Sequence, residues 1–235
     1  METDSTNTEC LTAAKAGDTG PLWVLARRQT DARGSRGRHW TSYEGNLFAS
    51  YLFVPQAPST SLGQITFVIA LAVHDALAQL IEEVEVDVNV ALKWPNDVLL
   101  EGSKVCGILL ESHEISEARI VIAGIGLNCF THPGETSYPA TSLAEHQINI
   151  TARNMLDRIA PLMDYWLEAW EHGDKFQRIR DAWTNRAKGI GAQITVRLRE
   201  TQHSGIFDCI DDAGRLVLRK DNGKREPISV ADIFF

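Results

Sequence analysis

Between two apolar segments the chain reads Lys93-Trp94-Pro95-Asn96-Asp97 and, seven residues on, Lys104-Val105-Cys106-Gly107. These runs place two cations, a carboxylate and an amide close together in the sequence. Lysine holds phosphate oxygens as a point charge, and Asp and Asn supply the oxygen ligands that Mg²⁺ takes. The stretch therefore predicts a catalytic centre for an anionic substrate, next to short strands.

A segment rich in arginine and glycine precedes this motif, from Gln29 to Trp40. Five of the 23 basic residues fall within positions 27–38. Guanidinium groups bind phosphates and carboxylates in a bidentate way, while Gly34 and Gly37 let the backbone approach a ligand closely. A second anion-binding element is one interpretation. A solvated, mobile loop is the other, because charge runs are usually on the surface.

Plainer interpretations also exist for the first motif. Asp97 in a strand-end turn would make an ordinary salt bridge, and a lone Lys104 would be a surface residue with a partly buried stem.

Other kinds of site are disfavoured. Gly124-Ile125-Gly126 begins like a dinucleotide fingerprint, but Cys129 replaces the third glycine and no helix is expected to follow. The seven histidines lack paired metal-ligand spacing, and no nucleophile elbow is present.

Composition sets the class of protein. A chain of 235 residues fits one large domain, or one large and one small. The 31 acidic against 23 basic residues argue against binding to extended nucleic acid.

Four cysteines without C-x-x-C spacing fit reduced thiols, and residues 1–7 lack the pattern of a secretory signal, so we expect a cytoplasmic protein. The apolar run 65–81 is broken by polar residues, which predicts a buried helix rather than a membrane span.

Periodicity divides the chain into a larger α/β portion, of the α+β type, and a small β portion. Helices are expected at residues 5–17, 64–80, 155–170 and about 175–187. Strands are expected at residues 22–28, 46–54, 90–94, 98–101, 105–112 and 119–124. These strands would form a mixed or antiparallel sheet, and the last two helices would cover one of its sides.

The second portion begins after Gly189-Ile190-Gly191. Short strands are expected at residues 194–198, 204–210, 216–219 and 226–230, joined by turns at 211–214 and 221–223. About fifty residues are near the lower limit for an independent fold, so this module should lean on the larger domain. We therefore expect two domains, 1–188 and 189–235.

Taken together, these motifs resemble the biotin protein ligases, also called biotin-[acetyl-CoA-carboxylase] ligases. The segments that carry the resemblance, in the family's order and at its approximate spacing, are Asp4–Asn7, Arg33–Trp40, Gly45–Leu47, Lys93–Asp97, Lys104–Leu109 and Gly126–Asn128. They span the catalytic domain up to about residue 130. The resemblance implies a biotin/lipoate ligase-like catalytic domain with a mixed sheet and flanking helices, followed by a small SH3-like β barrel.

The resemblance also implies a two-step reaction that uses biotin, ATP and Mg²⁺. The biotin carboxylate attacks the α-phosphate of ATP to give biotinyl-5'-AMP and pyrophosphate, and a lysine of a biotin carboxyl carrier domain then attacks the acyl carbon. The catalytic residues would be Lys104, Arg36 and Lys93. The biotin-binding residues would be Ser5, Thr6, Asn7, Gln29, Arg33, Gly34, Ser35, Lys104 and Gly107. The nucleotide-binding residues would be Arg36, Arg38, Trp40, Lys93, Asn96 and Asn128, with Asp97 and Asn96 as ligands of Mg²⁺.

Two departures from the family pattern stand out. Ala32 and Ser35 replace the first glycine and second arginine of the usual Gly-Arg-Gly-Arg loop. We also expect the strand that precedes Asp4 in the family to be missing. No residues are available for the helix-turn-helix of some relatives, so we expect no direct DNA binding. From the broken apolar run we also expect no membrane partner. Two alternative functions remain open: a lipoate or octanoate ligase of the same fold, and a biotin-binding module without catalysis. Assembly into a homodimer also remains open.

Overall fold

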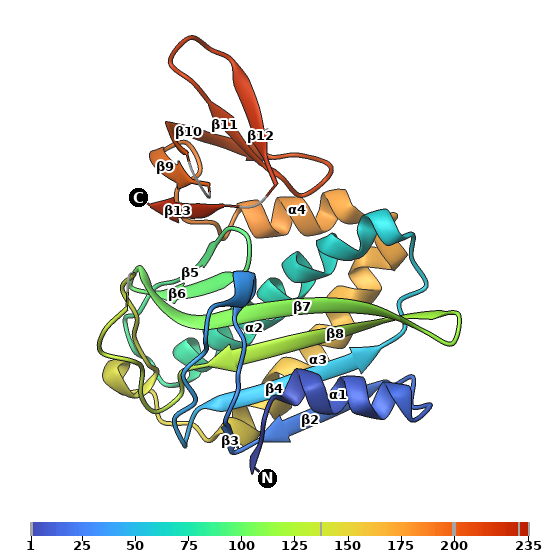
Figure 1. Cartoon of the computed structure of the whole chain (residues 1–235). Coiled ribbons are helices and arrows are strands. Elements are labelled where there is room, and N and C mark those ends of the chain that lie inside the picture. Colours follow the sequence, from blue (N-terminus) through green and yellow to red (C-terminus); the bar gives the residue numbers. More distant parts are fainter. Residues whose placement is uncertain (1, 137, 199–200, 230, 235) are drawn as a thin grey trace.

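A six-stranded sheet forms the centre of the larger domain (Figure 1). The computed structural model describes residues 2–136, 138–198, 201–229 and 231–234. In spatial order the strands are β2 (Leu22–Ala26), β4 (Leu47–Phe53), β8 (Ala118–Leu127), β7 (Ser103–Ile115), β6 (Asp97–Leu100) and β5 (Val90–Lys93). Each described neighbour pair is antiparallel. Of the two sheet types that the sequence left open, the antiparallel one is observed.

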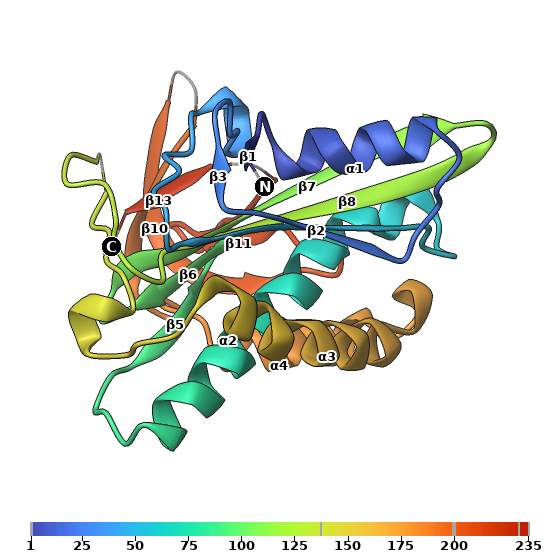
Figure 2. The same ribbon diagram turned by 90° about the horizontal axis from the view of Figure 1, so that it is seen from below.

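Helices cover both faces of this sheet, as Figure 2 shows from below. One face carries α2 (Ile65–Glu83), α3 (Ala152–Trp170) and α4 (Phe176–Thr184), so the last two predicted helices do lie together on one side. The other face carries α1 (Thr6–Lys15), which starts after Ser5. Gly17 follows its end with a φ of 101°, a conformation that glycine adopts readily. Short 3-10 turns occur at Ser35–Gly37, Ser59–Gln64, Ala144–His146 and Glu171–Gly173.

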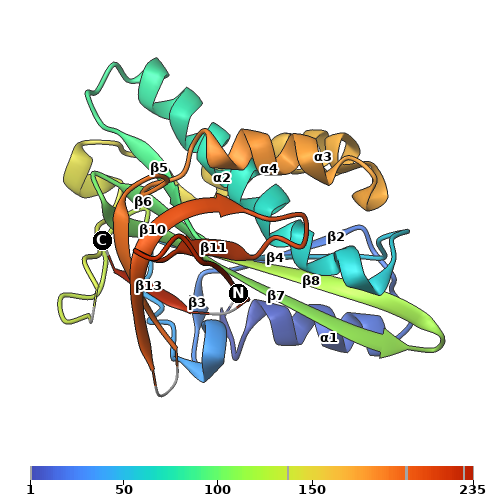
Figure 3. The same cartoon turned by 90° about the horizontal axis from the view of Figure 1, so that it is seen from above.

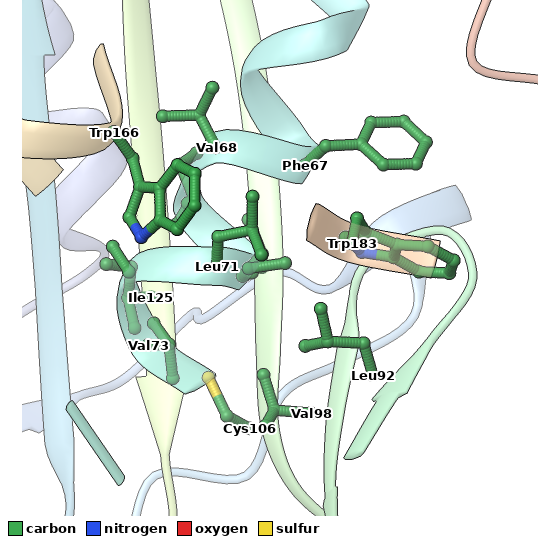
Figure 4. Packing of buried hydrophobic residues seen from close by; sticks show 14 of the residues in the cluster. Phe67, Val68, Leu71, Val73, Leu92, Val98, Cys106, Ile125, Trp166 and Trp183 are labelled. Atoms are coloured by element: carbon green, nitrogen blue, oxygen red, sulfur yellow. The ribbon is translucent and has the colours of Figure 1, made fainter. Parts of the chain in front are cut away.

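The main core lies between α2 and the sheet (Figure 4). Val68 and Leu71 of α2 pack there among residues of β6, β7 and β8, and Trp183 of α4 closes one end. The helical stretch Ser59–Glu83 is long and apolar enough to cross a membrane by composition, with a mean hydropathy of 1.6. Because 72% of its apolar window is buried inside the protein, this core accounts for its hydropathy.

The N-terminal residues differ from one expectation. Glu2–Thr3 form a short strand, β1, which pairs in parallel with β3 (Arg28–Gln29). The prediction that a strand before Asp4 is missing was therefore wrong. This pairing brings the start of α1 next to Gln29, which matters for the site described below.

The C-terminal module is a five-stranded antiparallel sheet in the order β12-β11-β10-β9-β13. Its strands are β9 (Gln193–Arg197), β10 (Gln202–Ile210), β11 (Leu216–Arg219), β12 (Arg225–Ile228) and β13 (Asp232–Phe234). Val230, the end of one predicted strand, lies outside the described residues. Trp94 Nε1 donates a hydrogen bond to Gly214 O at 3.0 Å, and Arg180 pairs with Asp212. The module thus rests on the larger domain, beside β5 and β6 (Figures 1 and 3).

Candidate active site

The motif residues form one row across the sheet. Lys93 pairs with Asp97, Asp97 with Gly107, and Gly107 with Gly126. Directly opposed residues of neighbouring strands project to the same face. Lys93 and Asp97, four residues apart in the sequence, therefore share a face with the two glycines, and the space above the glycines is open to other groups.

Lys104 lies beside this row and is held on several sides. Its Nζ is 2.6 Å from Asp97 Oδ1, and the two side chains are only 12% and 19% exposed. The ring centroids of Trp40 and Tyr138 lie 5.3 and 5.1 Å from the same Nζ. The salt bridge of the plainer interpretation exists, but it is largely buried between the cavities described below. Lys104 is not a surface lysine.

Trp40 occupies the space above the two glycines. A Cβ atom on Gly107 would lie 2.8 Å from the indole, and one on Gly126 would lie 2.6 Å from it. Both distances are far below a van der Waals contact. Position 126 must therefore be a glycine because the Trp40 ring lies directly above it. This packing requirement accounts for Gly126 without a dinucleotide-binding turn.

A cavity of about 200 Å³ lies between α1, the arginine-rich loop and the sheet. Its polar end is formed by Thr6, whose N and Oγ1 lie 2.8 and 3.1 Å from Gln29 Oε1. Ser50 Oγ lies 2.7 Å from Thr6 Oγ1 and donates to Asn7 Oδ1 at 2.5 Å. The predicted biotin residues that line this cavity are Ser5, Thr6, Asn7, Gln29, Arg33, Gly34, Ser35, Lys104 and Gly107.

Asn7 and Arg33 share a partner, Glu111, that no sequence motif indicates. Asn7 Nδ2 donates to Glu111 Oε2 at 2.7 Å, and Arg33 lies 3.3 Å from Glu111 Oε1. Both ends of the Asn7 amide are thus engaged, since its oxygen accepts from Ser50. Asn7 orients the polar end of the cavity, and Glu111 ties the arginine-rich loop to β7.

A second cavity, of about 270 Å³, lies between the motif row and the C-terminal sheet. Predicted nucleotide and metal residues line it, namely Arg36, Arg38, Lys93, Asn96 and Asp97. Both arginines bind Asp232 of β13, Arg36 at 2.8 Å and Arg38 at 3.2 Å. Ser35 also binds Arg38: its carbonyl oxygen accepts from Arg38 Nε at 3.2 Å, and its Oγ accepts from Arg38 Nη2 at 3.1 Å. Asp232 was not found by sequence reasoning.

The electrostatic setting of this second cavity affects Lys93. Burial lowers the pKa of Lys93, against the opposing effect of Asp97 and with a further lowering by Lys104. The Cys106 thiol in the core beneath has a raised pKa, mainly because it is buried. Burial also raises the pKa of Cys129 to about 12. These thiols are therefore neutral core groups and not nucleophiles.

The third cavity, of about 160 Å³, is lined by Trp40, Asn128 and Tyr138 among others. Asn128 is buried, and its Nδ2 donates to Thr141 O at 3.0 Å. Trp40 Nε1 is buried without a hydrogen-bond partner among the described residues. This cavity adjoins the first across Trp40 and Lys104.

The expected metal ligands form a sparse donor set. Asn96 Nδ2 donates to Ile108 O at 2.7 Å, so the amide nitrogen and not the oxygen is used in that bond. The described residues contain no cluster of three or more His, Cys, Asp or Glu side chains suited to a metal ion. A single carboxylate with an amide oxygen fits Mg²⁺ that arrives with a nucleotide, because Mg²⁺ usually keeps waters and binds through one or two carboxylates plus substrate phosphates.

Comparisons with known proteins agree with this arrangement. Residues 2–128 match the Biotin/lipoate A/B protein ligase family, and residues 189–235 match the Biotin protein ligase C terminal domain. The biotin–[acetyl-CoA-carboxylase] ligase of Paracoccus denitrificans is 39% identical over 99% of this chain and 98% of its own length. The enzyme of the same name from Mycobacterium tuberculosis is 33% identical, over 99% and 86%.

Solved structures agree as well. A biotin protein ligase from Aquifex aeolicus, in complex with biotin and ATP, superposes with a TM-score of 0.82 at 27% identity, over 99% of this chain and 96% of that one. This chain therefore shares its fold with that protein. The chain therefore belongs to the Biotin/lipoate A/B protein ligase family and, within it, to the biotin protein ligases.

Proposed function

We propose that this protein is a biotin–[acetyl-CoA-carboxylase] ligase that joins biotin to a lysine of a biotin carboxyl carrier domain in two steps. The biotin carboxylate first attacks the α-phosphate of ATP, forming biotinyl-5'-AMP and releasing pyrophosphate. The carrier lysine then attacks the acyl carbon, and AMP leaves. The observation that carries this proposal is that three cavities of suitable chemistry meet at Lys104.

The cavity of about 200 Å³ is assigned to biotin. Thr6, Gln29 and Ser5 offer hydroxyl and amide groups at its inner end, which suits the polar head of biotin. Arg33, Gly34 and Ser35 also line it, and Lys104 and Gly107 would face the carboxylate. The relative from Aquifex aeolicus, which was solved with biotin and ATP, supports the assignment at the level of the family.

The remaining two cavities are assigned to the nucleotide. The larger one carries Arg36, Arg38 and Lys93, which match the charge of the phosphates. The smaller one is lined by Trp40, whose ring can stack on a base, and by Asn128, whose amide can hydrogen-bond to it. The α-phosphate would then lie between them, next to Lys104.

Lys104 is the residue to which we assign charge stabilisation in the first step. Negative charge accumulates where the carboxylate meets the α-phosphate, and a fixed ammonium in a site sheltered from water stabilises it strongly. Asp97 keeps the ammonium in place through the 2.6 Å ion pair. Mg²⁺ held by Asp97 and Asn96 would neutralise further phosphate charge when it is bound with ATP.

The test is the intact mass of a biotin carrier domain after incubation with this protein, biotin and ATP–Mg²⁺. A gain equal to one biotin, dependent on ATP and on the carrier lysine, is the expected result. The same assay with octanoate or lipoate tests the ligase alternative, and preferential gain from either acid would overturn the proposal. Biotin binding without ATP-dependent pyrophosphate release would identify a non-catalytic module instead.

Three further expectations belong to the same proposal. The domain boundary at 188–189 is testable by limited proteolysis between α4 and β9. Assembly into a homodimer is testable by light scattering. A reducing compartment such as the cytoplasm suits four free cysteines, of which three are buried.

A further inference from the structure

Lys104 and Tyr138 lie at the junction of the three cavities described above. Among the described residues, Lys104 and Tyr138 are the ones that line all three. Lys104 was predicted from its motif, whereas Tyr138 belongs to no motif and has no assigned role. The bond between the biotin carboxylate and the α-phosphate would form at this junction, so both side chains border the reacting atoms.

Tyr138 is tied to Lys104 through the backbone as well. Lys104 N donates to Pro139 O at 2.8 Å, and Thr141 N donates to Lys104 O at 3.0 Å. Lys104 and Ala140 therefore form a parallel bridge. The loop that carries Tyr138 runs beside the start of β7, so the position of the phenol ring is coupled to that of the lysine.

The phenol ring contacts the ammonium in a way that leaves its hydrogen-bond donors available. The ring centroid of Tyr138 lies 5.1 Å from Lys104 Nζ, that of Trp40 lies 5.3 Å away, and Asp97 Oδ1 accepts from the ammonium at 2.6 Å. An ammonium has three N–H donors, and Asp97 takes one of them. An aromatic face attracts a cation through the ring quadrupole, whereas a carboxylate accepts a hydrogen bond from it. In the part of the chain that the structure describes, Asp97 is the acceptor of the ammonium, so its other donors can bind oxygens of a substrate.

We propose that Tyr138 is a positioning residue for Lys104. Its ring, with that of Trp40, confines the ammonium to the junction of the cavities and shields it from water, while Asp97 fixes its direction. The inference rests on the proposed function, because the acyl phosphate that Lys104 would stabilise is the intermediate of that reaction. The ring, and not the phenol hydroxyl, carries the effect.

The first test compares Tyr138→Leu with Tyr138→Phe in biotin-dependent exchange of pyrophosphate into ATP. Tyr138→Leu should lower kcat roughly tenfold, as loss of one partly desolvated cation–π contact does, with less change in KM for biotin. Tyr138→Phe should retain activity within about twofold, because it keeps the ring. Tyr43→Leu, at an exposed tyrosine, is the matched control. Unchanged kcat in Tyr138→Leu, or equal losses in the Leu and Phe variants, would overturn the inference.

The second test asks whether Tyr138 acts through Lys104. Dissociation of added biotinyl-5'-AMP should be faster in Tyr138→Leu than in the unmodified protein, and this acceleration should vanish in a Lys104→Met background. Additive effects of the two substitutions would show that Tyr138 acts independently, against the proposal. Absence of exchange in the unmodified protein would overturn the proposed function itself, whereas normal exchange there with an unaffected Tyr138→Leu overturns only the role of Tyr138.

Discussion

Asp232 Oδ2 lies 2.8 Å from Arg36 Nη1, so the last strand of the C-terminal sheet holds the arginine-rich loop of the catalytic domain. The same carboxylate reaches Arg38, 194 residues earlier in the chain. Both loop arginines thus have an internal anion as partner, in a cavity that we assign to phosphates. Several properties of the enzyme should depend on this contact and on its neighbours.

Substitution of Lys104 should impair the first step. Lys104→Ala removes the charge nearest the junction of the cavities, and loss of a comparable stabilising group in other enzymes lowers kcat about 100- to 1000-fold. Pyrophosphate exchange measures this directly. The control is Lys175→Ala, since the Lys175 side chain is 63% exposed and remote from the cavities. Near-normal exchange in a folded Lys104→Ala protein would remove this residue from the site.

The loop from Arg33 to Trp40 should become ordered by the intermediate. Its ion pairs to Asp232 involve arginine side chains that are 33% and 46% exposed, and pairs of this kind contribute little stability. Limited proteolysis should cut within Arg33–Arg38 more slowly when biotin and ATP are present. Asp232→Asn removes both pairs at once and should speed the ligand-free cut slightly, unlike Asp221→Asn in an exposed turn. Equal cleavage with and without ligands would refute the prediction.

Position 35 should influence how firmly the intermediate is retained. Serine offers a short neutral hydroxyl, which here binds Arg38, whereas an arginine would add attraction to the phosphate. Ser35→Arg should therefore slow the dissociation of biotinyl-5'-AMP and reduce stray biotinylation of unrelated proteins. The measurement is the off-rate from both forms. An unchanged or faster off-rate in Ser35→Arg would show that Arg36 and Arg38 already close the site.

The lowered pKa of Lys93 should appear in the pH dependence of ATP use. Burial disfavours the charged ammonium, so Lys93 loses its proton below the ordinary value of 10.5 as the pH rises. KM for ATP should then increase between that lowered pKa and 10.5. Lys93→Arg, which stays charged, should move this increase to higher pH. If KM for ATP rises at the same pH in both proteins, the rise belongs to another titrating group.

Alanine at Gly126 should disturb the site through Trp40. The added Cβ would lie 2.6 Å from the indole, and overpacking of this kind costs about 1–3 kcal/mol of stability. Urea unfolding should show the loss, together with weaker biotin binding in calorimetry. Gly63→Ala is the control, because nothing lies within 4 Å of a Cβ there. Equal stability of Gly126→Ala and the parent would contradict the placement of Trp40.

Local patterns in the sequence predicted the parts of the molecule that local forces determine. The helical period of α2 and the short apolar runs of β5 to β8, bounded by turn residues, needed no knowledge of distant contacts. The site residues that the family resemblance implied line the three cavities. Asp232, Glu111 and Tyr138 were missed, because each becomes part of the site only through contacts with residues far away in the sequence. A lone Asp on a short strand or a lone Tyr in a polar loop carries no such signal.

The paired glycines beneath Trp40 have a consequence for how related sequences diverge. The indole fits only because positions 107 and 126 carry no side chain, on two strands that are directly opposed. A larger residue at either position requires a smaller one at position 40, and a chain that keeps tryptophan there must keep both glycines. On this steric ground we expect substitutions at the three positions to be tolerated together rather than one at a time.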